Sequence, residues 1–147
     1  MKLLVVGSAL LSLGAGFAHA QTLLVSGNPG TMTVTGAVAG SQPLTVTDNF
    51  TTYTVSALVI QPKKITAQIN TNMPGGVTLT ILLVAPSGGA TSAGRVALDN
   101  TARDVVSNIT NTIPQARTIE YQLTATVSAG VVPISTRTVT LTLVNYP

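Results

Sequence analysis

Polar and apolar residues alternate with a period of two along most of this chain. The alternation is clearest in residues 117–128 and 135–144, where threonine or another polar residue is followed by an aliphatic or aromatic one. This pattern predicts strands with one buried side and one solvent-facing side, because successive side chains of a strand point to opposite faces. Further strands are predicted in residues 31–38, 43–49, 51–60, 64–70, 76–85, 94–100 and 103–109.

Glycine and proline separate these segments, as in residues 28–30, 74–76 and 86–89. Glycine permits unusual backbone angles and proline removes a ladder donor, so both end strands. Short strands at turn spacings of roughly 8–12 residues favour a β-sandwich. We therefore predict an all-β fold, an Ig-like antiparallel β-sandwich of about seven to nine short strands.

Two antiparallel hairpins are predicted from neighbouring segments. The strands 117–128 and 135–144 can pair across the connection 129–134. Residues 82–98 form a second candidate hairpin, whose tip consists of small residues.

The first twenty residues have a different pattern. Lys2 is followed by an apolar stretch to Phe17, and Ala18-His19-Ala20 places small residues at the positions −3 and −1 of a cleavage site. These features predict a cleavable secretory signal helix in residues 1–20. Residues 21–147 would then form a single β-sandwich domain that is secreted, extracellular or periplasmic or associated with the cell surface, without stable membrane insertion after cleavage.

Cleavage after residue 20 would remove several kinds of chemistry. His19 is the only histidine, and the chain contains no cysteine and no tryptophan. Catalysis by Ser–His or Cys–His pairs and zinc or copper sites built on these residues are therefore excluded. We expect no catalytic, cofactor-binding or metal-binding residues, no cofactor and no enzymatic activity.

The few carboxylates leave two weak alternatives open. Asp99 and Asp104 are candidates for a two-carboxylate hydrolytic mechanism. Asp48 with Asn49, or Asp99 and Asn100 with Asp104, are candidates for a calcium site, although the spacing of a calcium-binding loop is absent. The favoured interpretation is solvated loop charges and Asx turns at strand ends.

Low charge is the main compositional clue to function. Charged residues make up 7% of the chain, whereas about a quarter is usual. The basic residues are scattered, so nucleic acid is not an expected partner. A surface with so few charges tends to associate, so we expect the partner to be a second copy of the chain or another surface protein.

The candidates for self-association lie near both ends of the predicted domain. In residues 135–144, Val139, Leu141 and Leu143 should face the core, which places Val144 and Tyr146 on the threonine side unless a bulge intervenes. Leu23, Leu24 and Val25 lie in residues 21–27, which we interpret as either an extension for a neighbouring subunit or an ordinary first strand.

Two stretches, residues 63–88 and 120–147, resemble secreted bacterial Ig-like β-sandwich proteins. The pattern is also loosely similar to subunits of surface fibres and pili. This resemblance implies that an N-terminal extension of one subunit completes the fold of the next. The chain differs from most such pilins in lacking a disulfide.

Together these features lead to two hypotheses. The first is an exported, non-enzymatic structural protein of the bacterial cell surface that self-assembles as a fibre- or coat-like subunit. The alternative is a monomeric adhesin-like or ligand-binding β-sandwich module, although the scarcity of aromatic residues argues against sugar stacking.

Overall fold

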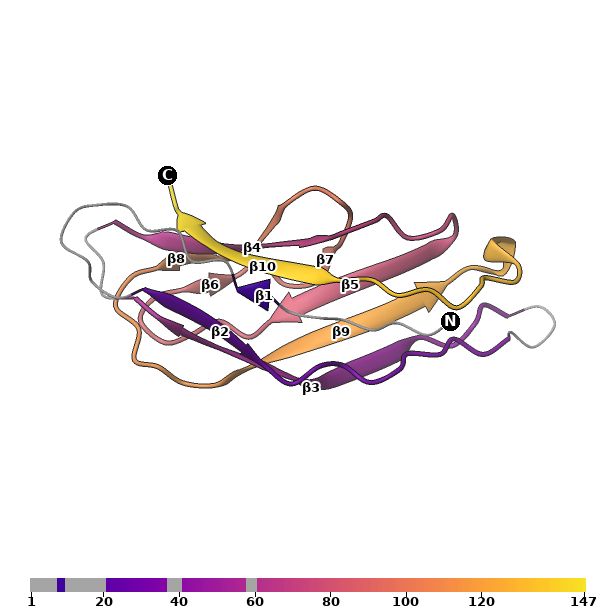
Figure 1. Cartoon of the computed structure of the whole chain (residues 1–147), viewed down its shortest axis with the longest axis horizontal. Coiled ribbons are helices and arrows are strands. Elements are labelled where there is room, and N and C mark those ends of the chain that lie inside the picture. Colours follow the sequence, from indigo (N-terminus) through magenta and orange to yellow (C-terminus); the bar gives the residue numbers. More distant parts are fainter. Residues whose placement is uncertain (1–7, 10–20, 37–40, 58–60) are drawn as a thin grey trace.

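The computed structural model of the chain describes residues 8–9, 21–36, 41–57 and 61–147. These residues form ten strand segments in two five-stranded sheets (Figure 1). In sheet A the order is β1 (Ser8–Ala9), β10 (Val139–Asn145), β4 (Lys63–Ile69), β8 (Arg103–Ile109) and β6 (Thr91–Ser92). In sheet B it is β2 (Thr22–Ser26), β3 (Val46–Ser56), β9 (Arg117–Ala125), β5 (Val77–Leu83) and β7 (Val96–Ala97).

The two sheets enclose one hydrophobic core, as the alternation in the sequence predicts. In β9 the side chains of Ile119, Tyr121 and Leu123 are buried, while the residues between them are only partly buried. β4 and β5 contribute inward-facing aliphatic side chains to the same cluster. The prediction of an all-β fold is confirmed for the described residues, which form two antiparallel sheets apart from the parallel pair β1–β10.

Two buried tyrosines anchor the centre of this core. Tyr53 on β3 and Tyr121 on β9 are almost completely inaccessible to solvent. The hydroxyl of Tyr53 donates a hydrogen bond of 2.6 Å to the carbonyl of Val84, which compensates for its burial. Burial raises the pKa of both phenols above their ordinary value of 10.0.

One predicted hairpin is wrong. β9 and β10 lie in different sheets, because both sides of β9 are occupied by β3 and β5. β10 instead pairs antiparallel with β4. The connection between β9 and β10 contains a short 3-10 turn, η1 (Val127–Ala129), and crosses from one sheet to the other.

The second predicted hairpin is confirmed in part. β5 and β7 pair antiparallel in sheet B through Thr80 with Ala97 and Ile81 with Val96. Between them, β6 pairs with β8 in sheet A. The connection between β5 and β7 therefore contains a strand of sheet A, where the sequence predicted only the tip of a hairpin.

Residues 31–38 were predicted to form a strand, and the described part, residues 31–36, contains none. Met32 is buried and Val34 packs against the core, so the alternation in this segment does reflect alternating burial. The segments 43–49 and 51–60 contribute to one strand, β3, whose pairing with β9 shifts register between Asp48 and Thr51. A strand pattern predicts which side chains are buried without guaranteeing a ladder partner.

The predicted signal helix, residues 1–20, lies outside the described residues apart from β1. Residues 21–147 contain all of the described core residues, which lie between Met32 and Leu141. None of the helices in the described part of the chain has the length and hydrophobicity needed to cross a membrane.

Candidate functional site

In the order of the described strands, sheet B ends in β2 and β7, and sheet A ends in β1 and β6, with β10 next to β1. β2 and β10 lie on the same side of the molecule and are in contact across the two sheets. At the opposite ends of the strand order, β6 and β7 are two residues long. β10 has seven residues and β2 has five, so this side has the longer strands. We call this side, formed by β2 and β10, the long-edge side and the other the short-edge side.

Half of the backbone groups of β10 point away from β4. The N–H of Asn70 donates to the carbonyl of Thr138 at 3.0 Å, and the N–H of Tyr146 donates to the carbonyl of Pro62 at 2.9 Å. In an antiparallel pair, hydrogen-bonded and non-hydrogen-bonded positions alternate. The backbone groups of the odd-numbered residues, Val139, Leu141, Leu143 and Asn145, therefore point to the outer edge.

Among the described residues, β1 alone pairs with this outer edge. Ser8 lies opposite Thr140 and Ala9 opposite Leu141, in the only parallel pairing of the two described sheets. β1 covers two positions of a strand of seven residues. This pairing shows that the outer edge of β10 has the geometry to accept an added strand.

Val144 and Tyr146 remain on the threonine side of β10. The register between β10 and β4 is continuous from Val139 to Asn145, so no bulge returns them to the core. The side chain of Tyr146 is 37% exposed. Leu143 is partly buried and packs against the core, as predicted.

Leu23, Leu24 and Val25 lie in β2, which pairs antiparallel with β3 of the same chain. Leu23 and Val25 are partly buried against the core, and the side chain of Leu24 is 63% exposed. In this structure the segment is thus a first strand of its own sheet. The five predicted residues therefore lie on the long-edge side, in β2 and β10 or immediately after β10.

Charged residues gather next to the short-edge side. Arg95 and Asp99 flank β7, and Arg95 forms an ion pair with Glu120 of β9. Arg103 at the start of β8 pairs with Asp99. The hydrogen bonds from Arg103 and from the N–H of Thr101 hold the pKa of Asp99 below its ordinary value of 3.8. β2 and β10 themselves contain no charged residue, and Lys63 of β4 donates a hydrogen bond to the side chain of Asn145 at the end of β10.

The candidate acidic residues are occupied by partners within the protein. The carboxylate of Asp48 accepts hydrogen bonds from the N–H of Gly30 at 3.0 Å and of Phe50 at 3.2 Å. Asp104 forms an ion pair of 3.0 Å with Lys64. Within the described residues, no three His, Cys, Asp or Glu side chains cluster in a way that could hold a metal ion. Asp99 and Asp104 therefore form ion pairs with two different basic side chains, Arg103 and Lys64.

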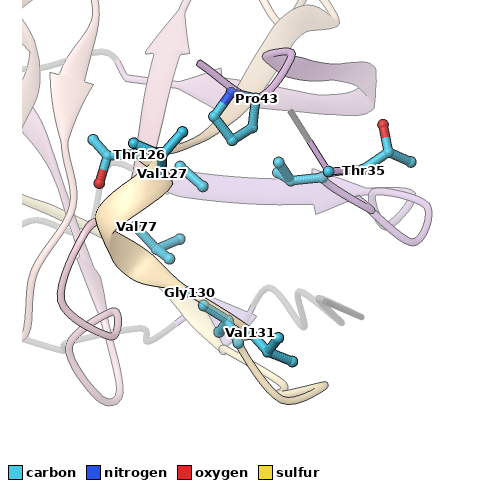
Figure 2. Close-up of a pocket in the computed structure, with 11 residues that line it drawn as sticks. Thr35, Pro43, Val77, Thr126, Val127, Gly130 and Val131 are labelled. Carbon is cyan, nitrogen blue, oxygen red and sulfur yellow. The ribbon is translucent and has the colours of Figure 1, made fainter. Parts of the chain in front are cut away.

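A pocket of about 490 Å³ lies where β9 leaves sheet B (Figure 2). The lining comes from the first residue of β5, the last residue of β9 and the connection after β9. Residues 34–36 and Pro43, which precede β3, complete it. The pocket was missed in the sequence because its wall comes from separate segments. The sequence does contain one signal for this pocket, which is the number of aliphatic residues in the connection 126–134. The lining residues are Val34, Thr35, Gly36, Pro43, Val77, Ala125, Thr126, Val127, Gly130, Val131 and Val132.

Comparisons of the chain with protein-family models, with curated proteins and with solved structures found no match. The functional interpretation therefore rests on the edges, charges and cavities of this structure.

Proposed function

We propose that this chain is an exported, non-enzymatic structural protein that self-assembles through its long-edge side. The observation that carries the proposal is the outer edge of β10. There, four residues direct their backbone groups away from β4, and only two residues of β1 pair with the strand among the described residues. Unpaired edges of this kind are sites of strand addition.

The composition of both edges supports this role. β2 and β10 carry no charge, and proteins usually protect an exposed edge with charged residues or proline. Leu24 and Tyr146 add exposed apolar surface along the same side. Contact between two copies would bury these side chains and pair the free backbone groups at the same time.

Export connects to assembly through residues 1–20. If they form a cleaved signal segment, cleavage removes β1 and leaves the whole outer edge of β10 available. We interpret the remaining domain as an Ig-like sandwich that functions outside the cell or in the periplasm. The internal pairing of the carboxylates and the absence of cysteine support a structural role without a cofactor.

Tyr146→Asp is the substitution that tests the edge. It places a charge beside β10 at a partly exposed position, so the average mass in light scattering should fall towards that of the monomer while the thermal unfolding temperature stays within a few degrees. The control is Tyr146→Phe, which keeps the ring and should assemble normally. An unchanged mass for Tyr146→Asp would contradict the proposed role of β10.

If the unaltered exported protein is a monomer at every concentration, self-assembly is wrong. That result would favour the alternative of a monomeric binding module on the cell surface.

A further inference from the structure

The outer edge of β10 is already occupied at one place in this structure. β1 runs parallel to β10, with Ser8 opposite Thr140 and Ala9 opposite Leu141. It also contacts β2, the strand of the other sheet that borders the same side. Figure 1 shows β1 as a short arrow between β10 and β2. A backbone segment from the first twenty residues therefore lies where the edges of the two sheets meet on the long-edge side.

The register shows which backbone groups this segment covers. The odd-numbered residues of β10 point to the outer edge. In a parallel pair, the hydrogen bonds of one residue run to the two residues that flank its partner. The backbone of Ser8 is therefore directed toward Val139 and Leu141, and the backbone groups of Ala9 point the other way.

This pairing and the proposed assembly compete for the same groups. A strand added by a second copy would need the outward groups of β10, and two strands cannot pair with one edge at the same positions. With β1 in place, the stretch of β10 that stays free is residues 142–145. That stretch is shorter than an average strand of five or six residues. The uncleaved chain therefore offers a second copy a much shorter edge than residues 21–147 do.

The predicted cleavage site lies in the connection between this segment and the domain. β1 ends at Ala9 and β2 begins at Thr22, and the expected cut follows Ala20. While the connection is intact, β1 pairs within one molecule and at a high effective concentration. After the cut the same pairing would join two molecules, and two paired residues provide too few hydrogen bonds to offset the cost of association. Cleavage would thus both detach β1 and release it.

We propose that residues 8–9 cover the outer edge of β10 until cleavage, so that the uncleaved chain does not assemble. This inference rests on the proposed self-assembly and adds its regulation. The occupant of the edge is a segment of the same chain, and removal of residues 1–20 exposes the edge. Assembly through β10 is then restricted to copies that have lost this segment.

Uncleaved and cleaved proteins test this regulation. Ala18→Leu with Ala20→Leu replaces the two small residues that cleavage requires and keeps residues 1–147 together. Sedimentation velocity is measured for both proteins in the same mild detergent. The apparent dissociation constant of the assembly should be at least about tenfold higher for the uncleaved protein than for residues 21–147. Equal assembly of the two proteins would overturn the proposal and leave the proposed role of β10 standing.

Two proline substitutions in the uncleaved protein separate the pairing of β1 from the presence of an apolar segment. Ser8→Pro removes the N–H that is directed at β10, so assembly should return to within about twofold of that of residues 21–147. Ala9→Pro is the matched control, because the N–H of Ala9 points away from β10 and the pairing should survive. If Ser8→Pro assembles as poorly as the unaltered uncleaved chain, the block does not come from β1 and the proposal is wrong.

Hydrogen exchange tests the pairing independently of assembly. The N–H of Leu141 faces β1, whereas the N–H of Thr142 faces β4. In dilute solution, exchange at Leu141 should be at least about tenfold slower in the uncleaved protein than in residues 21–147, with equal exchange at Thr142 in both. Equal exchange at Leu141 would overturn the inference even if the cleaved protein assembles. A cleaved protein that stays monomeric, with Leu141 protected only in the uncleaved chain, would overturn the proposed self-assembly and its regulation while the pairing stands.

Discussion

The long-edge side and the short-edge side of this molecule differ in the length and the charge of their strands. On the short-edge side, β6 and β7 are two residues long, and β7 lies between Arg95 and Asp99. On the long-edge side, β2 and β10 have five and seven residues and no charge at all. Both sides complete the same two sheets around one core.

This difference affects how each side can pair with another molecule. Very short edge strands and neighbouring charges are devices that prevent edge-to-edge pairing. The short-edge side has both, whereas on the long-edge side charged neighbours lie only at one end of β10, where Lys63 and Lys64 of β4 are opposite Asn145 and Val144. An unprotected edge is a stability risk for an isolated domain and an advantage for a subunit, which is why we place the function on the long-edge side.

The largest expected effect on stability comes from comparing the two sides of β10, the side that faces β4 and the outer edge. Val144→Pro removes an N–H that faces β4 and leaves its acceptor without a partner, so we expect it to lower the free energy of unfolding by about 1–3 kcal/mol. Asn145→Pro removes an N–H that faces the outer edge, and it should reduce assembly with a much smaller effect on folding. Urea denaturation and light scattering on the two variants measure both quantities. Equal loss of stability in both would show that the outer edge is not free.

A matched pair of charges compares the two sides directly. Thr142→Lys places a cation on β10, and Thr91→Lys places one on β6. We expect the first to raise the apparent dissociation constant of the assembly about tenfold, equivalent to ~1.4 kcal/mol, and the second to leave it unchanged. Sedimentation velocity over a concentration series provides the constant. Similar behaviour of both variants would remove the distinction between the sides.

The ion pairs of the short-edge side should contribute little to folding. Glu120→Gln breaks the pair with Arg95, in which both side chains are about one-third exposed. Such pairs are worth less than about 1 kcal/mol because solvent screens them. Chemical denaturation should show this small loss, and light scattering should show unchanged assembly. A large change in particle mass would mean that the charged side takes part in the contact.

The smallest effect concerns acid. The pKa of Asp99 is lowered in the folded protein, so its contribution to stability is present above the ordinary value of 3.8 and is lost as pH falls through the lower folded value. Thermal unfolding of Asp99→Asn should therefore be slightly less dependent on pH below 4. Because β2 and β10 contain no ionisable side chain, and the α-amino group that cleavage would create at Gln21 titrates only near pH 8, assembly itself should not change between about pH 5 and pH 7. A strong change in that range would implicate charges that lie elsewhere.

Alternation in the sequence predicted most of the fold because it records burial directly. It located the strands around Ile65, Leu79, Tyr121 and Leu141, whose side chains are all in the core. It failed where pairing depends on distant segments. β10 pairs with β4, which is some seventy residues earlier, and no local feature of residues 129–134 distinguishes that arrangement from a hairpin with β9.

The candidate site was predictable to a similar extent. The out-of-phase positions of Val144 and Tyr146 follow from the period of a strand, so the sequence places them away from the core unless a bulge intervenes, and the continuous register of β10 with β4 excludes that bulge. The pocket depends on which segments meet at the end of β9. The sequence only marks Val131 as an aliphatic residue in a segment that contains turn formers.

The most direct test is the size of residues 21–147 in solution. Light scattering at several concentrations, combined with negative-stain microscopy, measures mass and shape without any substitution. The proposed role predicts a mass that exceeds that of the monomer and grows with concentration, with elongated particles in the images. A monomeric mass at every concentration would contradict self-assembly and, with it, the role we assign to the long-edge side.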